Sequence, residues 1–294
     1  MTNWTTIWLC ARVNLLKWSV TPRMYTIAAI ILAFAIWIFA WISDYASAVG
    51  VNVTPWVFPY LLTMPIIFMI YGVLTTLLFS DAPFTDSHTP FLMVRTSRRN
   101  WVLGQLLYIL ITSFLYTAFF VLMSMVVLIP NLKFSLDWGA VLKTLAYDPG
   151  SPAKYNIESY SYIKDPVISM FSAMEAMLIS FGLFWLVSLF MGVLIFCFNV
   201  VLGRLSGLIA AGVFTCIAYF AVYVGKLSFG NMVYYISPLS WTSMFYLDWG
   251  NTSSMPTPLY AISCLFGAIV LMSIISVKVY CMKDVDVQER RSSL

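Results

Sequence analysis

The residues with the clearest chemical potential lie in one polar stretch of an otherwise apolar chain. The sequence TPFLMVRTSRRNWVLGQLLYI, residues 89–109, places Arg95, Arg98 and Arg99 directly before a long apolar run. Guanidinium groups at such a position can bind anionic lipid headgroups or acidic groups of a protein partner. They can also act only as determinants of membrane topology. The pattern indicates an electrostatic contact at a membrane boundary, or a topology signal alone.

Groups that could support catalysis or bind a metal are scarce. His88 is the only histidine, and the cysteines form no CxxC pair or Cys/His cluster. Acid–base and nucleophilic catalysis need paired groups, and a zinc site needs several such ligands close together. We therefore expect no catalytic site and no metal site, which makes a membrane-embedded enzyme the least favoured class.

Two features could serve a transported molecule. Gln105, Tyr108, Thr112 and Tyr116 recur at steps of three or four, so they share one face of a helix. They could line a route for an amphipathic substrate, or they could hydrogen-bond to neighbouring helices. Glu175 is the one acidic residue inside an apolar run, and such carboxylates are candidates for function. It could equally reach headgroup water at the outer start of its run.

The elements that must position these residues follow from composition. Apolar residues make up 61% of the chain, charged residues make up 10%, and the mean hydropathy is +0.88. Such a chain has too little polar surface for a soluble globule, and it suits bilayer-spanning helices. We predict a single all-α integral membrane domain over 1–294. Its six expected transmembrane helices lie near 24–43, 56–79, 102–129, 168–198, 206–225 and 258–280.

The basic residues orient these spans. If the N-terminus is inside, every arginine falls in an inner segment. The segments 130–167 and 226–257 are then extracellular, and their basic residues are all lysines. The positive-inside rule then places both termini in the cytoplasm. Residues 80–101 become a cytoplasmic loop. In that loop Asp81 and Asp86 could cap a short helix that enters a groove on a soluble partner, or the loop could be a solvated turn.

The N-terminal segment 1–23 is expected to lie along the inner membrane interface. Its apolar residues recur at helical spacing, at Trp4, Trp8, Ala11, Leu15 and Trp18. Arg12, Asn14 and Lys17 lie elsewhere on the helical wheel, with the lysine and arginine side chains toward the cytoplasm. This predicts an amphipathic interfacial helix.

The two outer segments are too polar to cross. Residues 226–257 are rich in aromatic side chains, and two short helices meeting near Ser237 and Pro238 would explain that mixture. A belt of aromatic residues at the interface is the alternative. Residues 130–167 are either a cap over the substrate or a folded surface loop, and the sequence leaves both open.

This layout resembles the permease subunits of type-2 ATP-binding-cassette (ABC) transporters, which are mostly bacterial exporters. The resemblance covers nearly the whole chain. At the level of motifs it rests on RTSRRNWVLGQLL (95–107) before the third span and on ISPLSW (236–241), which includes Ser237, Pro238 and Trp241. The first resembles the family's basic entry to that span, and the second resembles its outer-hairpin motif.

The resemblance implies a multi-pass transport subunit of a bacterial cell membrane, paired with a second permease copy or a related permease. Separate ATPase subunits would bind ATP and Mg, since this chain has no phosphate-binding loop motif, and no cofactor or nucleic acid is expected in it. The loop 80–101, with Asp81, Asp86, Arg95, Arg98 and Arg99, would couple to the ATPase. The implied function is export of an amphipathic peptide, lipid or drug-like molecule. An ion-coupled secondary transporter or a channel is the alternative.

Overall fold

The computed structural model describes residues 3–63, 65–85, 95–159, 163, 165–203, 205–250 and 253–282. Within these ranges the secondary structure is helical, and no strand forms beyond an isolated parallel bridge between Val53 and Leu132. The predicted all-α class is therefore confirmed for the described part of the chain.

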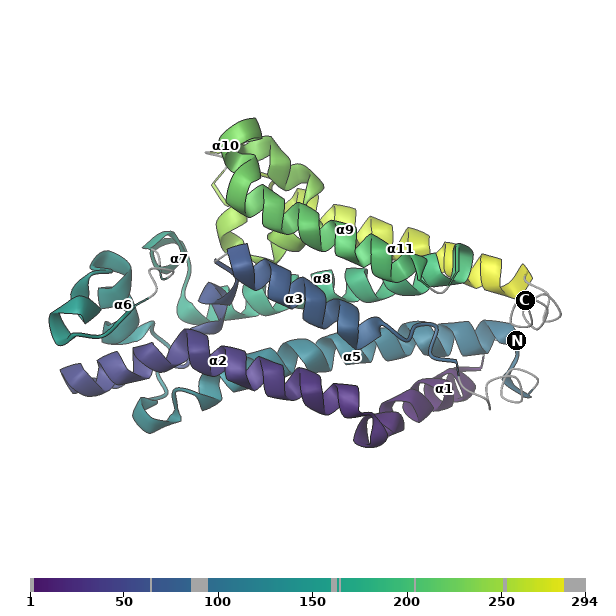
Figure 1. Cartoon of the computed structure of the whole chain (residues 1–294), viewed down its shortest axis with the longest axis horizontal. Helices are drawn as coiled ribbons and strands as arrows, with labels where there is room; N and C mark the ends of the chain where they lie inside the picture. The colour runs from purple at the N-terminus through teal and green to yellow at the C-terminus, as the bar shows by residue number, and fades with distance from the viewer. Residues whose placement is uncertain are drawn as a thin grey trace.

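Five helical stretches in the described chain are long and apolar enough to cross a membrane. They are α2 (Pro22–Val49), α5 (Arg98–Val126), α8 (Ala173–Val201), the stretch Ser206–Ile236 that begins with α9 (Ser206–Phe220), and α11 (Pro258–Met282). Figure 1 shows them running roughly along the long axis of the molecule, with α8 within the bundle. In the most apolar part of α8, 67% of the residues are buried inside the molecule, whereas in that of α11 only 17% are buried.

The second expected span, 56–79, contains a shorter helix. Helix α3 (Pro65–Phe79) has 15 residues, and the 3₁₀ turn η2 (Phe58–Thr63) precedes it with Leu62 in a non-helical conformation. Pro65 lacks a backbone N–H and disfavours a helical residue before it, which explains why α3 begins there. In the part of the chain that the structure describes, there are thus five long apolar helices and a shorter apolar one, α3, of 15 residues.

Helix α1 (Trp4–Leu16) packs against α5 through a face that differs from the predicted one. Its buried residues are Ile7, Cys10, Ala11 and Asn14. A Cβ atom placed on Gly104 of α5 would lie 2.5 Å from the Cβ atom of Cys10, so this glycine permits the close approach of the two helices. Asn14 is therefore packed inward, which its place on the predicted polar side of the helix did not indicate.

The tryptophans of α1 remain outside this contact. Trp4 is 70% exposed and Trp8 is 44% exposed. Exposed indole rings on a helix beside apolar spans suit the headgroup region of a membrane. The interfacial helix remains a prediction, and its apolar face is divided between α5 and the surroundings.

The described part of the segment 130–167 is folded. It contains α6 (Gly139–Tyr147), the 3₁₀ turn η4 (Ser151–Tyr155) and the start of α7 (Asp165–Met170). An exposed ion pair joins Lys154 Nζ to Asp148 Oδ2 at 2.9 Å. The hydrogen bond from Lys154 lowers the pKa of the Asp148 carboxyl.

The segment 226–257 turns back towards the bundle after α10 (Lys226–Phe229). Gly230 has a φ of 64°, which a residue with a side chain rarely adopts, and it marks the reversal. In place of the two predicted short helices, the return path consists of 3₁₀ turns: η6 (Gly230–Ile236), η7 (Pro238–Thr242) and η8 (Met244–Tyr246). Aromatic side chains and a proline favour this irregular path over a regular helix.

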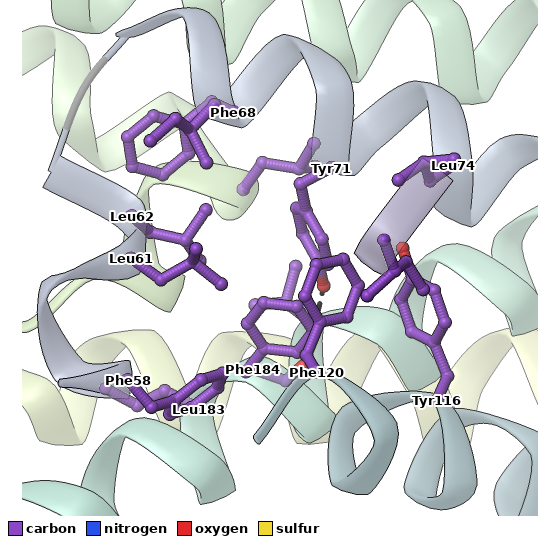
Figure 2. Packing of buried hydrophobic residues seen from close by; sticks show 14 of the residues in the cluster. Phe58, Leu61, Leu62, Phe68, Tyr71, Leu74, Tyr116, Phe120, Leu183 and Phe184 are labelled. Carbon is purple, nitrogen blue, oxygen red and sulfur yellow. Dashed lines mark hydrogen bonds between the residues drawn. The ribbon is translucent and has the colours of Figure 1, made fainter. Parts of the chain in front are cut away.

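The core at the middle of the bundle is aromatic. Figure 2 shows side chains from η2, α3, α5 and α8 meeting there, including Phe58, Tyr71, Tyr116 and Phe184. The ring centroids of Tyr71 and Phe184 are 4.4 Å apart, and the Tyr71 hydroxyl lies 2.9 Å from Ser188 Oγ. Aromatic packing with a satisfied hydroxyl fixes α3, despite its short length, against α8.

Several elements distant in sequence gather at one end of the molecule. Figure 1 shows α1, the first turns of α5 and the last turns of α11 at this end, which we call the arginine end. The end of α3 and the turn between α8 and α9 lie there as well. We call the other end the loop end. It comprises α6 and α7 together with the described residues of 51–63 and 226–257.

Candidate functional site

The arginine cluster occupies the first turn of α5 and the residues just before it. Ser97 Oγ caps α5 by accepting a hydrogen bond from the Asn100 N–H, at 3.5 Å. Arg95 and Arg99 are exposed, and Arg98 is half-buried. The first turn contains no acidic residue. Cations at a helix N-terminus oppose the helix dipole by about 0.3–1 kcal/mol each. These arginines therefore do not stabilise α5, and their placement suits an anionic partner.

Asp81 is held by a residue that sequence reasoning did not select. Arg23 Nη1, in the first turn of α2, lies 2.7 Å from Asp81 Oδ2 and donates to Ser80 Oγ at 2.6 Å. The Asp81 side chain is 63% exposed, whereas that of Arg23 is 18% exposed. The pair ties the start of α2 to the loop after α3. The available signal was an arginine directly after Pro22, at the entry to a span.

Asp86 lies outside the described residues, as does His88. Of the predicted coupling loop, the structure therefore describes 80–85 and 95–101.

Asn199 connects this loop to the α8–α9 turn. Its Nδ2 donates to the Ala82 carbonyl at 2.8 Å, and its Oδ1 accepts from the Gly207 N–H at 2.8 Å. Asn199 is 6% exposed, so both polar ends of the amide are satisfied in a buried setting. Sequence reasoning missed it, although a single asparagine near the end of a long apolar run was the visible signal.

The predicted polar row on α5 is a buried seam between helices. Gln105, Tyr108, Thr112 and Tyr116 are each no more than 5% exposed. Three of them bond to the elements on either side, whereas Thr112 Oγ1 is buried without a hydrogen-bond partner among the described residues. Gln105 Oε1 accepts from Asn14 Nδ2 at 2.8 Å, the Tyr108 hydroxyl accepts from Trp18 Nε1 at 2.9 Å, and the Tyr116 hydroxyl accepts from Thr75 Oγ1 at 3.3 Å.

These bonds join α1, the 3₁₀ turn η1 (Lys17–Val20) and α3 to α5. Lys17 Nζ extends the network by donating to Asn14 Oδ1 at 3.1 Å. Of the two interpretations of the row, hydrogen bonding between neighbouring helices is the one its contacts favour.

Glu175 has a local structural role. Ser172 Oγ accepts from the Glu175 N–H at 3.4 Å, and Glu175 Oε2 accepts from the Ser172 N–H at 3.0 Å, which forms a capping box at the start of α8. The side chain is exposed. It lies about 14 Å along the helix from Phe184, where α8 meets Tyr116. The structure does not bring Glu175 to the polar row.

The hairpin residues Ser237, Pro238 and Trp241 are buried at a different place. Trp241 Nε1 donates to the Tyr234 carbonyl at 2.7 Å, and the Ser237 N–H donates to the same carbonyl at 3.4 Å. These contacts stabilise the return path after Gly230. They do not join the arginine cluster.

Two apolar grooves open between the helices. One, of about 600 Å³, lies between Met69–Leu77 of α3, with Ser80 just after that helix, and Leu208–Tyr219 of α9. The other, of about 520 Å³, is lined by Trp18 and Ser19 of η1, by Met24–Ile31 of α2 and by Leu115–Leu122 of α5. Tyr116 belongs to its lining, so one end of the polar row reaches this groove. Both volumes lie in the range of small-molecule sites.

Among the described residues, no three metal-ligating side chains cluster, and the cysteines there are free thiols. The arrangement offers neutral hydrogen-bonded seams, apolar grooves and one cationic end. Comparison with family models, curated proteins and solved structures gives no match to this chain.

Proposed function

We propose that this chain is the membrane-spanning permease subunit of a type-2 ABC transporter, energised by a separate ATPase subunit. The observation that carries the proposal is the arginine end. There a cationic helix start lies on the same loop that Arg23 and Asn199 tie to α2 and to the α8–α9 turn. A protein docked at this end would act on several helices at once.

The same end supports an orientation. Every arginine in the described chain lies there, so the positive-inside rule favours a cytoplasmic arginine end. With η2 and α3 counted as one crossing, the chain would cross six times and both termini would be cytoplasmic. A bacterial cell membrane and a second permease copy are part of the proposal through the resemblance of the layout.

The chemistry of the ATPase contact follows from the helix dipole. Arg98 and Arg99 occupy positions where a positive charge is unfavourable for α5 itself. Acidic side chains on a partner, or anionic lipid headgroups, would offset that cost and gain charge-assisted hydrogen bonds.

We assign the substrate path to the two apolar grooves. The polar row on α5 is not used for this purpose, because its side chains are buried between helices. The α2–α5 groove is apolar over most of its lining and has Trp18, Ser19 and Tyr25 at one end. Such a site suits an amphipathic peptide, a lipid or a drug-like molecule that enters from the side. Export, as the direction, rests on the family resemblance.

Purification of a tagged chain from its native membrane tests the proposal. We expect an ATPase subunit to co-purify and to hydrolyse ATP. Arg98→Gln with Arg99→Gln should keep the chain in the membrane and lower transport-coupled hydrolysis. Lys143→Gln, an exposed cation on α6, is the matched control and should have no effect.

Two results would contradict the proposal. One is transport by the purified chain in vesicles that contain an ion gradient and no ATPase, which would favour an ion-coupled transporter or a channel. The other is hydrolysis and complex recovery that are unchanged in the double arginine variant.

A further inference from the structure

The connection between α5 and α6 exposes large apolar side chains. Ile129 is 61% exposed, Phe134 is 75% exposed and Leu136 is 72% exposed. We call these three residues the outer apolar tip. Exposed singly, such residues need no explanation, but three within one short connection form a feature that water does not favour.

The tip is held in a fixed position. Asn131 Nδ2 donates to the Ser43 carbonyl at 2.9 Å and to Ser47 Oγ at 2.7 Å, both on α2. The Lys133 N–H donates to the Val53 carbonyl at 2.8 Å, and Trp56 Nε1 donates to the Ser135 carbonyl at 2.7 Å. The apolar side chains therefore project from a braced backbone.

The bonds to α2 fix the depth of the tip. Ser43 lies 21 positions after Pro22, the first residue of α2, which corresponds to about 31 Å along a helix. The hydrocarbon core of a bilayer is about 30 Å thick. If α2 enters the hydrocarbon near Pro22, the tip lies where the far side of the hydrocarbon meets the headgroups. Figure 1 draws this connection as the teal turn below α2, nearer the middle of the molecule than α6.

The tip continues an apolar surface that begins on α5. Leu115, Leu122 and Val126 are 41%, 55% and 42% exposed, and Ile129 follows at the same helical spacing. This stripe belongs to one of the helices long enough to span a membrane. The exposed apolar surface of α5 therefore continues as far as Ile129, and beyond it Phe134 and Leu136 alternate with the exposed polar residues Lys133 and Ser135.

The neighbouring α6 region has a different surface. Its exposed side chains include Asp148 and Lys154, which form the ion pair described above. Charged groups of this kind favour water. The tip carries charges as well, since Lys133 and Asp137 flank Phe134 and Leu136 and are exposed, so its apolar side chains stand next to groups that would stay among the headgroups.

We propose that the outer apolar tip inserts into the headgroup–acyl boundary of the leaflet at the loop end and anchors the protein there. Phe134 and Leu136 enter the acyl region, while the ammonium of Lys133 stays among the headgroups. The braced backbone makes this anchor set the depth of α2 and α5, the two helices that form the wall of one groove. The inference is independent of the transporter proposal.

Spin-label accessibility tests it. Single cysteines replace Phe134 and Leu136 in a chain whose exposed Cys216, Cys264 and Cys281 are changed to serine. The labelled protein is reconstituted in phosphatidylcholine vesicles with anionic lipid. We expect oxygen, which dissolves in lipid, to relax both labels more strongly than a water-soluble nickel chelate does.

Tyr147→Cys is the matched control, because Tyr147 is an exposed aromatic residue on α6. Its label should show the reverse order. Labels at 134 and 136 that behave like the one at 147 would overturn the proposal, and so would labels shielded from both reagents. Because Phe134 and Leu136 are exposed, neither substitution removes core packing. The proposal requires that the labels at both positions give the same order of relaxation by the two reagents.

Discussion

The two ends of the molecule use different kinds of polar contact. At the arginine end, two contacts join side chain to side chain across long stretches of sequence, beside the bonds of Asn199 to backbone groups. Asn14 pairs with Gln105, and Arg23 pairs with Asp81. Each such contact depends on the identity of both residues, so either partner can break it.

At the loop end, aromatic N–H and O–H groups bond mainly to backbone carbonyls. Trp138 Nε1 donates to the Phe171 carbonyl at 2.9 Å, and the Tyr246 hydroxyl donates to the Thr63 carbonyl at 3.1 Å. These contacts fix irregular loops and need only one particular side chain. The comparison teaches that a contact at the loop end needs one particular side chain, whereas a side-chain pair at the arginine end needs two.

The largest expected effect is at the loop end. Trp138 is 4% exposed, and its ring packs 5.8 Å from that of Tyr60. Trp138→Ala should lower the free energy of unfolding by about 3–5 kcal/mol, because it leaves a cavity and an unpaired carbonyl. Trp138→Phe keeps most of the packing and should cost about 1 kcal/mol for the lost bond. Thermal unfolding in detergent measures both, and equal losses would contradict the rigid role of the indole.

The next effect is at the arginine end. Asn199→Leu should leave the Ala82 carbonyl and the Gly207 N–H unpaired, at about 1–1.5 kcal/mol for each lost hydrogen bond. Hydrogen exchange should then rise in residues 80–85. Ser206→Ala is the control, since Ser206 Oγ bonds within the same turn, to the Phe198 and Gly203 carbonyls, and does not contact the loop. Equal hydrogen exchange of residues 80–85 in the two variants would contradict the proposed link between the loop and the α8–α9 turn.

A smaller effect tests whether side-chain pairs are exchangeable. In a double-mutant cycle of Asn14→Leu and Gln105→Leu, we expect a coupling free energy of about 0.6 kcal/mol, the average for interhelical bonds in membranes. The double variant should lose less stability than the sum of the two single variants. The reason is that each single variant leaves one amide unpaired, whereas the double variant removes both amides. Additive losses from reversible unfolding would show that the seam is only packing.

The smallest effect is that of the exposed pair at the loop end. The hydrogen bond from Lys154 lowers the pKa of Asp148, so any stabilisation is present above the unfolded-state pKa and is lost as the pH falls through the folded-state pKa. Asp148→Asn should therefore match the parent protein in acid and differ slightly at neutral pH. Thermal midpoints across this range provide the measurement, and a large difference at neutral pH would contradict a solvent-screened pair.

Part of the structure could be read from local sequence. Apolar runs predict the long helices, since their backbone groups must be satisfied internally in lipid. Pro65 marks the start of α3, and the order Ser172–Glu175 is that of a capping box. Our sequence reasoning took Glu175 as an acidic residue inside a span and missed this local role.

The chain by itself determined the helical class, the apolar runs and the collection of arginines on one set of loops, because these depend on composition and on neighbours in sequence. Only the tertiary structure decided that α1 turns Asn14 towards Gln105, that Arg23 pairs with Asp81, and that Asn199 bonds to Ala82. The reason is physical: an apolar helix can bury any side, and the helix that covers it is chosen by packing between segments far apart in the chain.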